Sequence, residues 1–292
     1  MELKKLHIGT VSYGTESMEE VRSIIIHEKS NPQSLPLSSS GQRGRREINS
    51  RVRDAVFALA VCHNVTPTLN EMGTVQYQAA SPDEIAIVQW ITSVGLYLIH
   101  RDRHTLHLRS EDGTVFIYNI LRVFPFTSEN KRMGIVVRDT NGQLWFFVKG
   151  ADMVMQKLLM ANDWMEEECS NMAREGLRTL VVGRRRLPEE LWAEFEDAFR
   201  VADRELGDRD MAKEMVMTKF LEYNLEILGI TGVEDKLQDN VKPSLELLRN
   251  AGIRIWMLTG DKIETARCVA ISSKLVVRGQ YIHTVTKGST SP

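Results

Sequence analysis

The sequence of 292 residues has no long uninterrupted apolar run. A membrane-spanning helix needs roughly 18 or more consecutive apolar residues. The longest uncharged stretch, Ile85 to Ile99, is interrupted by Gln89, Thr92, Ser93 and Gly95. The first residues also contain no apolar stretch of the kind found in secretory signals. We therefore expect a chain that neither crosses a bilayer nor carries a secretory signal.

An excess of either charge is missing as well, because 37 Lys and Arg face 39 Asp and Glu, a formal net charge of −2. No global basic field draws such a protein to nucleic acid or to an anionic membrane, and we predict no nucleic-acid partner. Cysteine is scarce. Cys62, Cys169 and Cys268 form no Cys-x-x-Cys motif and leave an odd thiol, which fits a reducing compartment, with the cytosol as the default.

Several site motifs are also absent. The sequence contains no phosphate-binding P-loop, no Gly-x-Gly-x-x-Gly fingerprint and no serine or cysteine nucleophile elbow. His100, His104 and His107 form a cluster, but the intervening Asp102-Arg103 is typical of a hairpin turn. We therefore expect three neutral surface histidines here and no zinc site.

The middle of the chain is rich in strand-like runs. Asp112-Gly113 and Asn141-Gly142 are hairpin signals, which predict an antiparallel sheet. The runs cover Leu96 to Ile99, Thr105 to Leu108, Thr114 to Val123, Met133 to Arg138 and Leu144 to Val148.

Helical patterns lie on both sides of these runs. Apolar residues recur at helical spacing from Asn49 to Val65. Ser81-Pro82-Asp83-Glu84 combines a cap residue, a proline at the first helical position and an acid three residues after the cap, so a capping box is its simplest interpretation. Further on, we expect helices over Ala151 to Leu159 and Trp164 to Arg174, a strand over Leu177 to Val182, and a helix after Pro188 with Leu191, Phe195, Phe199, Ala202 and Leu206 on one face.

The last part of the chain alternates between strand and helix. The patterns predict a strand over Leu225 to Ile230, a helix over Val241 to Asn250, a buried strand over Ile253 to Leu258 and a helix over Lys262 to Leu275. This order is typical of a parallel sheet with right-handed crossovers. We therefore predict an α+β domain over residues 1–224, with a flexible loop at 30–46, followed by part of an α/β domain over residues 225–292.

Thr259-Gly260-Asp261 lies between the predicted strand at Ile253 to Leu258 and the following helix. In open α/β sheets this is where the ligand crevice lies. A hydroxyl, a glycine and helix-start amides suit a phosphate. A strand-to-helix turn capped by Thr259 or Asp261 explains the same residues equally well, so both interpretations stay open.

Lys149-Gly150 ends one predicted strand, and Phe124-Pro125-Phe126 ends a neighbouring one. A base that stacks on an aromatic ring gains about 1–3 kcal/mol, and a hydrogen bond from lysine to phosphate contributes about 1.5–3 kcal/mol. A pocket with both residues could hold a nucleotide. Each residue also has a structural interpretation, Phe126 as a core aromatic and Lys149 as a solvated charge at the sheet edge.

Six segments, in this order along the chain, resemble the cytosolic signatures of the P-type ATPases in the phospholipid-flippase branch. They are Ser81-Pro82-Asp83-Glu84, Phe124-Pro125-Phe126-Thr127-Ser128 with Lys131-Arg132-Met133, Lys149-Gly150-Ala151-Asp152, Gly176-Leu177-Arg178-Thr179, Gly232-Val233-Glu234-Asp235 and Met257-Leu258-Thr259-Gly260-Asp261-Lys262. The resemblance covers nearly the whole chain, except the 30–46 loop and the last residues.

The resemblance implies a nucleotide-binding domain with a central antiparallel sheet, inserted into a haloacid-dehalogenase-like phosphorylation domain. It also implies ATP as the ligand, accompanied by Mg²⁺. Ten residues are implied to form the ATP site: Glu84 at the adenine, Phe126 stacked on it, Ser128 and Lys131 in the pocket wall, Lys149 at the nucleotide, Arg178 and Thr179 at the phosphates, and Thr259, Gly260 and Asp261 at the phosphate end.

The aspartate that this family phosphorylates lies in Asp-Lys-Thr-Gly-Thr, which does not occur in the sequence. Asp208-Arg209-Asp210 is only a look-alike, because it follows a helical pattern instead of a strand. The family's Gly-Asp-Gly-x-Asn-Asp metal loop and its membrane helices, through which phospholipid would be reached, are missing too. We therefore expect a catalytically incomplete chain that binds ATP, supplies no protein ligands for Mg²⁺ and has the remaining transporter domains as partners.

Two alternatives from other functional classes remain. One is a non-enzymatic regulatory or interaction fragment that binds nucleotide, and the other is a stand-alone phosphatase of the dehalogenase fold. Under the leading hypothesis, the longer protein lies at an internal membrane, Golgi or endosomal, with this chain on its cytosolic face. The segment from Leu225 to Pro292 would be an incomplete sheet with unpaired edges and low stability when isolated.

Overall fold

The computed structural model describes residues 1–27, 48–70, 74–205, 207–276 and 279–285. The predicted loop at 30–46 and Leu206 lie outside the described residues. Within them, no helix is both long and apolar enough to cross a membrane. Cys62, Cys169 and Cys268 are all free thiols, as expected.

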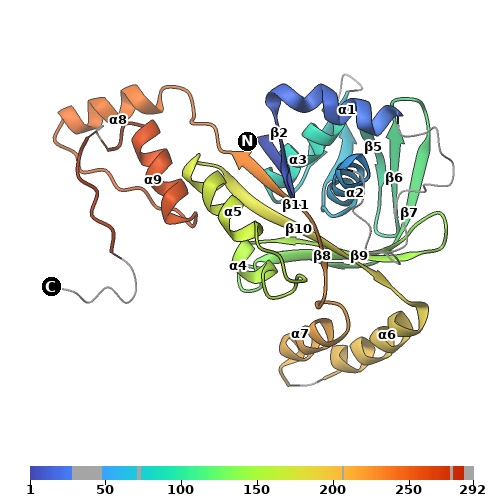
Figure 1. Cartoon of the computed structure of the whole chain (residues 1–292). Helices are drawn as coiled ribbons and strands as arrows, with labels where there is room; N and C mark the ends of the chain where they lie inside the picture. The colour runs from blue at the N-terminus through green and yellow to red at the C-terminus, as the bar shows by residue number, and fades with distance from the viewer. Residues whose placement is uncertain (28–47, 71–73, 206, 277–278, 286–292) are drawn as a thin grey trace.

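A nine-stranded sheet forms the centre of the molecule (Figure 1). Its strands follow the spatial order β2-β1-β11-β10-β9-β8-β7-β6-β5, and all neighbouring strands are antiparallel. The strands are β1 (Glu2–Ile8), β2 (Val11–Gly14), β5 (Leu96–Arg101), β6 (Thr105–Ser110), β7 (Val115–Phe124), β8 (Arg132–Arg138), β9 (Leu144–Gly150), β10 (Arg178–Leu187) and β11 (Glu226–Glu234).

The antiparallel sheet predicted between Leu96 and Val148 is confirmed. Gly113 and Gly142 have φ values of 87° and 77°, and both lie in the hairpin turns that the sequence indicates. This left-handed backbone conformation is open to glycine without steric cost. The turn at Asp102-Arg103 also joins two paired strands, β5 and β6.

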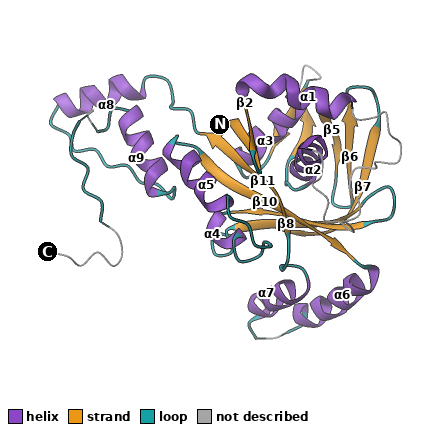
Figure 2. Cartoon of the chain, in the orientation of Figure 1, coloured by secondary structure: helices purple, strands orange, loops and turns teal. Residues whose placement is uncertain are grey.

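Helices cover both faces of the sheet (Figure 2). One face carries a short 3-10 turn, η1 (Thr15–Ser17), with α1 (Met18–His27), α2 (Ile48–Val61) and α3 (Pro82–Ser93), while α4 (Asp152–Met155), α5 (Met165–Arg174), α6 (Glu189–Asp203) and α7 (Arg209–Phe220) follow on the other side. A separate two-stranded hairpin comprises β3 (Thr66–Leu69) and β4 (Val75–Gln78). We call β1–β11 with α1–α7 the sheet unit.

The sheet separates two hydrophobic cores. Strand β9 is buried along its whole length, and its side chains alternate between the cores. Trp145 and Phe147 belong to the core beneath α1–α3, and Phe146 and Val148 belong to the core beneath α5 and α6. This period of two explains why a strand covered on both faces is almost continuously apolar.

The parallel sheet predicted after residue 224 was wrong, although the first of its two strands is present. The first, predicted at Leu225 to Ile230, is β11, which pairs antiparallel with β1 and β10. The second forms no strand: in Ile253 to Leu258, Trp256 is 84% exposed and Leu258 95%. Backbone groups adopt a stable strand only where a neighbour completes their hydrogen bonds, and no strand lies beside this run among the described residues. The division of the chain at residue 224 stays a prediction.

Beyond β11, residues 235–276 and 279–285 form what we call the C-terminal segment. Both of its predicted helices are confirmed, as α8 (Val241–Asn250) and α9 (Ile263–Ser272). Helix α8 buries none of its residues, whereas α9 lies against α5 (Figure 1). The Thr265 hydroxyl donates to the Leu177 carbonyl at 3.3 Å, and Lys262 forms an ion pair with Asp152.

Candidate functional site

Glu84 and Lys149 form a buried ion pair between α3 and β9. The Glu84 carboxylate lies 2.8 Å from the Lys149 ammonium and accepts a hydrogen bond from the Asn64 backbone N–H at 3.2 Å. The helix predicted at Ser81 is present, but the capping box was wrong, since Ser81 makes no side-chain cap hydrogen bond. A helix cap contributes only about 1 kcal/mol to the stability of a protein. A hydrogen bond between two charged groups, such as Glu84 and Lys149, is stronger than one between neutral groups.

Lys149 is not the solvated edge charge of the structural interpretation. Strand β9 lies between β8 and β10, where Lys149 is paired with Met133 and Val182, and the residue is only 4% exposed. Apart from the ion pair, its ammonium makes no hydrogen bond of normal geometry with the described residues. An unsatisfied buried donor costs about 1–3 kcal/mol, so a ligand that supplies acceptor atoms here would be stabilised.

The surroundings of this pair carry more positive than negative charge. Arg101 is buried, and its guanidinium lies 3.4 Å from Nδ1 of His63, which also accepts the Val65 N–H at 3.0 Å. Burial, together with the charges of Arg101 and Lys149, lowers the pKa of His63 well below its usual value, so His63 is neutral. Two cations therefore face one carboxylate, an environment that favours an electron-rich or anionic ligand.

The loop between β7 and β8, residues 125–131, carries three of the predicted residues. Phe126 is 61% exposed, so its interpretation as a core aromatic was wrong. Ser128 and Lys131 are exposed as well. The Ala151 N–H donates to the Lys131 carbonyl at 3.0 Å, which brings this loop to the end of β9 and to Lys149. The structure records no hydrogen bond of Phe126 or Ser128 with the other predicted residues.

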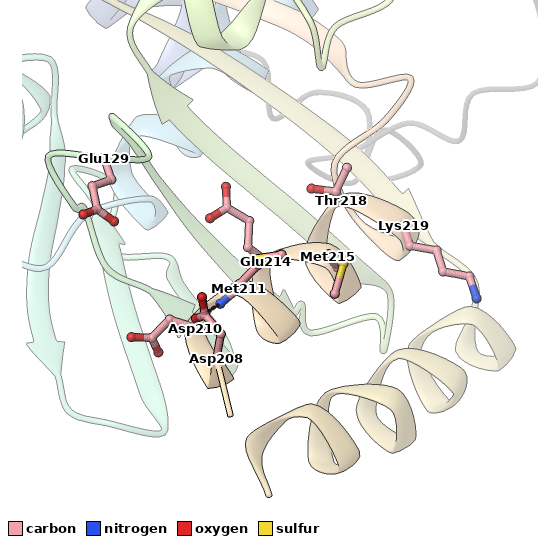
Figure 3. Close-up of a pocket in the computed structure, with 8 residues that line it drawn as sticks. All are labelled: Glu129, Asp208, Asp210, Met211, Glu214, Met215, Thr218 and Lys219. Carbon is pink, nitrogen blue, oxygen red and sulfur yellow. Dashed lines mark hydrogen bonds between the residues drawn. The ribbon is translucent and has the colours of Figure 1, made fainter. Parts of the chain in front are cut away.

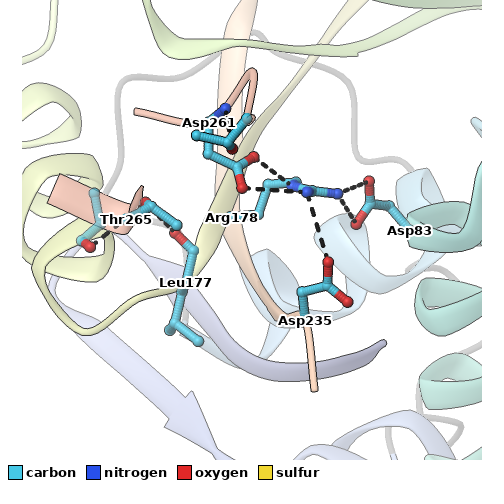
Figure 4. A network of polar contacts seen from close by, with 8 residues as sticks. Asp83, Leu177, Arg178, Asp235, Asp261 and Thr265 are labelled. Carbon is cyan, nitrogen blue, oxygen red and sulfur yellow. Dashed lines mark hydrogen bonds and ion pairs between the residues drawn. The ribbon is translucent and has the colours of Figure 1, made fainter. Parts of the chain in front are cut away.

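Arg178, at the start of β10, joins the sheet unit to the C-terminal segment (Figure 4). Its guanidinium donates to Asp261 at 3.0 Å and to Asp83 at 3.1 Å, and it lies 3.9 Å from Asp235. Partial burial opposes its positive charge, but the hydrogen bond to Asp261 and the charge of Asp83 raise its pKa overall. Because Asp83 is the neighbour of Glu84, the contacts of Arg178 and of Lys149 meet at the start of α3.

The Thr259-Gly260-Asp261 turn does not cap α9. Lys262 occupies the cap position, with no side-chain cap hydrogen bond. The Thr259 hydroxyl accepts the Asp261 N–H at 3.0 Å, and a Cβ atom added to Gly260 would meet nothing within 4 Å. The turn therefore presents an unobstructed backbone. Thr179 is half-buried in β10 opposite Gly232.

Sequence reasoning missed several residues of this region. Asp83, Asp235 and the Asp152–Lys262 ion pair lie inside segments that carry the family resemblance, so a signal for them was present. Arg101 had no such signal, because its role depends on the burial of β5. Among the described residues, no group of three or more His, Cys, Asp or Glu is arranged to hold a metal ion. The three aspartates around Arg178 are already engaged by its guanidinium.

A hollow of about 470 Å³ lies elsewhere, between α7 and the 125–131 loop (Figure 3). None of the ten predicted residues lines it. Four carboxylates face one ammonium there; the lining residues are Glu129, Asp208, Asp210, Met211, Glu214, Met215, Thr218 and Lys219. Such a lining repels a polyphosphate, which favours the region of Lys149 and Arg178 as the anion site.

Comparison with known proteins identifies the family. The family model described as "P-type ATPase, cytoplasmic domain N" matches residues 51–240. Phospholipid-transporting ATPase NEO1 of Saccharomyces cerevisiae is 53% identical over 98% of this chain and 25% of its own length. Probable phospholipid-transporting ATPase IIB is 47% identical in Mus musculus and 46% in Homo sapiens, in each case over 97% of this chain and 27% of the relative. The chain thus spans about a quarter of the length of these relatives.

Proposed function

The chain belongs to the P-type ATPase family, and on this premise we propose that it binds ATP as the cytoplasmic domain N of a phospholipid-transporting member. The observation that carries the proposal is the buried Lys149 ammonium, which has no hydrogen-bond partner in the described part of the chain apart from the Glu84 ion pair. An exposed aromatic ring, Phe126, lies on the loop that is hydrogen-bonded next to it. Together they offer a stacking surface and a buried cation.

We assign the adenine base to the end of the site that Glu84, Lys149 and Phe126 form. Phe126 stacks on the adenine, Glu84 and Lys149 face its polar edge, and Ser128 and Lys131 line the side of the pocket. Stacking of a base on an aromatic ring contributes about 1–3 kcal/mol. Since the Glu84–Lys149 contact joins α3 to β9, the packed sheet holds this end in place before ligand arrives.

We assign the phosphates to Arg178 and Thr179, with Thr259, Gly260 and Asp261 beyond them. In the structure the Arg178 guanidinium is shared among Asp83, Asp235 and Asp261. A triphosphate competes with these carboxylates for the same donors, so its arrival loosens the contact to Asp261. Mg²⁺, when bound, neutralises phosphate charge and accompanies the nucleotide.

The longer protein is proposed to couple ATP hydrolysis, through an aspartyl phosphate, to phospholipid transport at an internal membrane, with its other domains as partners of this chain. We propose that the residues after β11 belong to an incomplete haloacid-dehalogenase-like phosphorylation domain. The exposed apolar run from Ile253 to Leu258 supports this, because such a run is typical of a buried strand. As the sequence contains no Asp-Lys-Thr-Gly-Thr, we expect ATP binding without phosphate release.

Titration of the chain with ATP tests the proposal. Phe126→Ala should lose about 1–3 kcal/mol of binding free energy, with little change in melting temperature, because the ring is exposed. Val201→Ala on α6, another exposed apolar side chain, is the matched control and should bind as the unmodified chain does. Equal ATP affinity of all three proteins, or no binding by the unmodified chain, would contradict the proposal.

A second pair of variants tests the buried cation. Lys149→Met should weaken ATP binding, and Lys219→Met, in the acidic hollow, should not. Lys149→Met also leaves Glu84 buried without its partner, which is destabilising, so thermal unfolding has to be followed in parallel. The double variant Glu84→Gln/Lys149→Met removes both charges and restores stability but not affinity.

A further inference from the structure

Arg132 follows the 125–131 loop directly and is held by α7 and the chain just beyond it. Its guanidinium donates two hydrogen bonds to the Glu222 carboxylate, at 2.6 Å and 2.7 Å. The Glu222 side chain is 1% exposed and that of Arg132 is 9% exposed. Burial opposes the charge of Arg132, but the hydrogen bonds to Glu222 raise its pKa overall. The pair is therefore a buried, forked contact between two ionised groups, which is the strongest type of side-chain hydrogen bond.

The same guanidinium reaches two further segments. It donates to Glu214 on α7 at 3.3 Å and to the backbone carbonyl of Asn130, within the loop, at 3.2 Å. Figure 3 shows Glu214 on α7 on the side that faces Glu129, at the tip of the loop. One side chain therefore connects the loop, helix α7 and the residues that follow α7.

The loop itself has a constrained backbone at Lys131. Its φ value is 50°, in the left-handed region that side chains other than glycine rarely adopt. Two backbone hydrogen bonds hold it, from the Lys131 N–H to the Thr127 carbonyl at 2.8 Å and from the Ala151 N–H to the Lys131 carbonyl at 3.0 Å. Such a conformation persists only where the surroundings determine it, and it is frequent at ligand sites.

Arg132 and Lys149 lie on opposite faces of the sheet. Lys149 alternates with Phe147 and Trp145, which belong to the core beneath α1–α3. Arg132 is paired with Gly150, one residue further along β9, and its guanidinium donates hydrogen bonds to α7, the chain after α7 and the loop backbone. Arg132 therefore does not face the Glu84–Lys149 end of the site.

We propose that Arg132, anchored by Glu222 and Glu214, is a positioning residue for nucleotide binding. It fixes the 125–131 loop from the far face of the sheet, so that Phe126, Ser128 and Lys131 are presented to the base without contact between Arg132 and the ligand. This inference rests on the proposed ATP site and names a residue that sets its affinity.

The test measures ATP affinity and thermal midpoint for Arg132→Gln in two backgrounds. In the unmodified chain, affinity should fall about tenfold. In the Phe126→Ala/Lys131→Ala background the loop has lost the two largest side chains that we assign to the site, so the same substitution should change affinity less than about twofold. Arg138→Gln, at the other end of β8 and paired with Glu189, is the matched control and should bind ATP normally.

Arg132→Lys keeps the positive charge beside Glu222. A lysine ammonium, however, cannot donate two parallel hydrogen bonds to the Glu222 carboxylate and also reach the Asn130 carbonyl. The variant should fold with a somewhat lower thermal midpoint, because part of the buried contact with Glu222 is lost, and show intermediate affinity, which keeps the test decisive if Arg132→Gln fails to fold. Normal ATP affinity of Arg132→Lys, or an equal loss in both backgrounds for Arg132→Gln, would overturn the inference. No binding by the unmodified chain, or no effect of Phe126→Ala, would instead overturn the proposed function itself.

Discussion

The sheet unit and the C-terminal segment differ in how their residues are held. In the sheet unit, two cores bury both faces of the central strands, and Phe146 and Val148 are completely inaccessible to solvent. In the C-terminal segment, α8 buries no residue and Leu258 is 95% exposed. The segment is attached through polar contacts of Arg178, Lys262 and Thr265 and through α9, which buries only Thr265 and Ala270. The base end of the proposed site is therefore built by packing, and the phosphate end by a few charged groups.

This difference implies different motions at the two ends. Regions with few buried apolar contacts open with a lower free energy than a packed core does. Ligand that binds to both ends would therefore find one end preformed and order the other. We expect the following substitutions to act on the two regions unequally.

The largest effect is expected in the core of the sheet unit. Phe146→Ala removes a fully buried ring that contacts Phe124 edge to face, and it should lower the free energy of unfolding by about 3–5 kcal/mol. Leu258→Ala, in the C-terminal segment, should change it by less than about 0.5 kcal/mol. Urea unfolding followed by fluorescence measures both. Similar losses for the two variants would show that the C-terminal segment is packed as tightly as the sheet.

Thiol reactivity should separate the regions next. Burial raises the pKa of Cys62 to about 11 and that of Cys169 to about 12, whereas Cys268 on α9 is partly exposed. A raised pKa leaves less of the reactive thiolate at a given pH. Iodoacetamide should therefore modify Cys268 first, and Cys62 and Cys169 only in urea. Mass spectrometry would contradict this if Cys169 were alkylated as fast as Cys268.

A smaller effect is expected at the link between the regions. Arg178→Gln removes the shared ion pairs with Asp83 and Asp261, each worth about 0.2–1 kcal/mol for a partly exposed group. Because only the pair with Asp261 reaches the residues next to α9, hydrogen exchange of α9 should become faster by up to about fivefold, with the core of the sheet unit unchanged. Arg174→Gln, on the same side and with a guanidinium that donates to Asn171, should leave α9 unaffected. Unchanged exchange of α9 in Arg178→Gln would mean that other contacts hold it.

The smallest effect concerns a surface turn of the sheet unit. Backbone N–H groups of His104 and Thr105 lower the pKa of Asp102 below its ordinary value of 3.8. The stabilisation is therefore present above pH 3.8 and is lost as the pH falls through the lower native pKa. Asp102→Asn removes this carboxylate. The free energy of unfolding of the variant should therefore fall slightly less than that of the unmodified chain as the pH decreases through this range. If the free energy of unfolding had the same pH dependence in the two proteins, Asp102 would contribute nothing to the loss of stability in acid.

Much of the sheet was predictable because its signals are local. The hairpins at Gly113 and Gly142 need only a turn dipeptide between two apolar runs, and both are present. Strand β1 and the antiparallel pairing of β11 were missed, since each is fixed by a partner far away in sequence. Helix α7 was missed as well: Asp208 was considered only as a look-alike of a phosphorylated aspartate, whereas it caps this helix by accepting the Met211 N–H at 3.1 Å.

The site was less accessible to local reasoning. Patterns of residues left Phe126 and Lys149 with two interpretations each, because exposure depends on the tertiary structure. The structure excludes the structural interpretation in both cases, but the ligand roles of all ten residues still come from the family resemblance. Arg132 lies inside a segment that carries the family resemblance, but its contacts could not be predicted, since its partners Glu214 and Glu222 lie on a segment that is remote in sequence.

The central place of β11 has a consequence for biosynthesis. Of the strands in this sheet, β1 is made first, yet its inner neighbour, β11, is made last. Until then the nascent chain exposes the edges of β1 and β10, and such edges pair readily with other chains. Pairings between distant segments also form slowly. We therefore expect the nascent chain to be prone to pairing with other chains until β11 has been made.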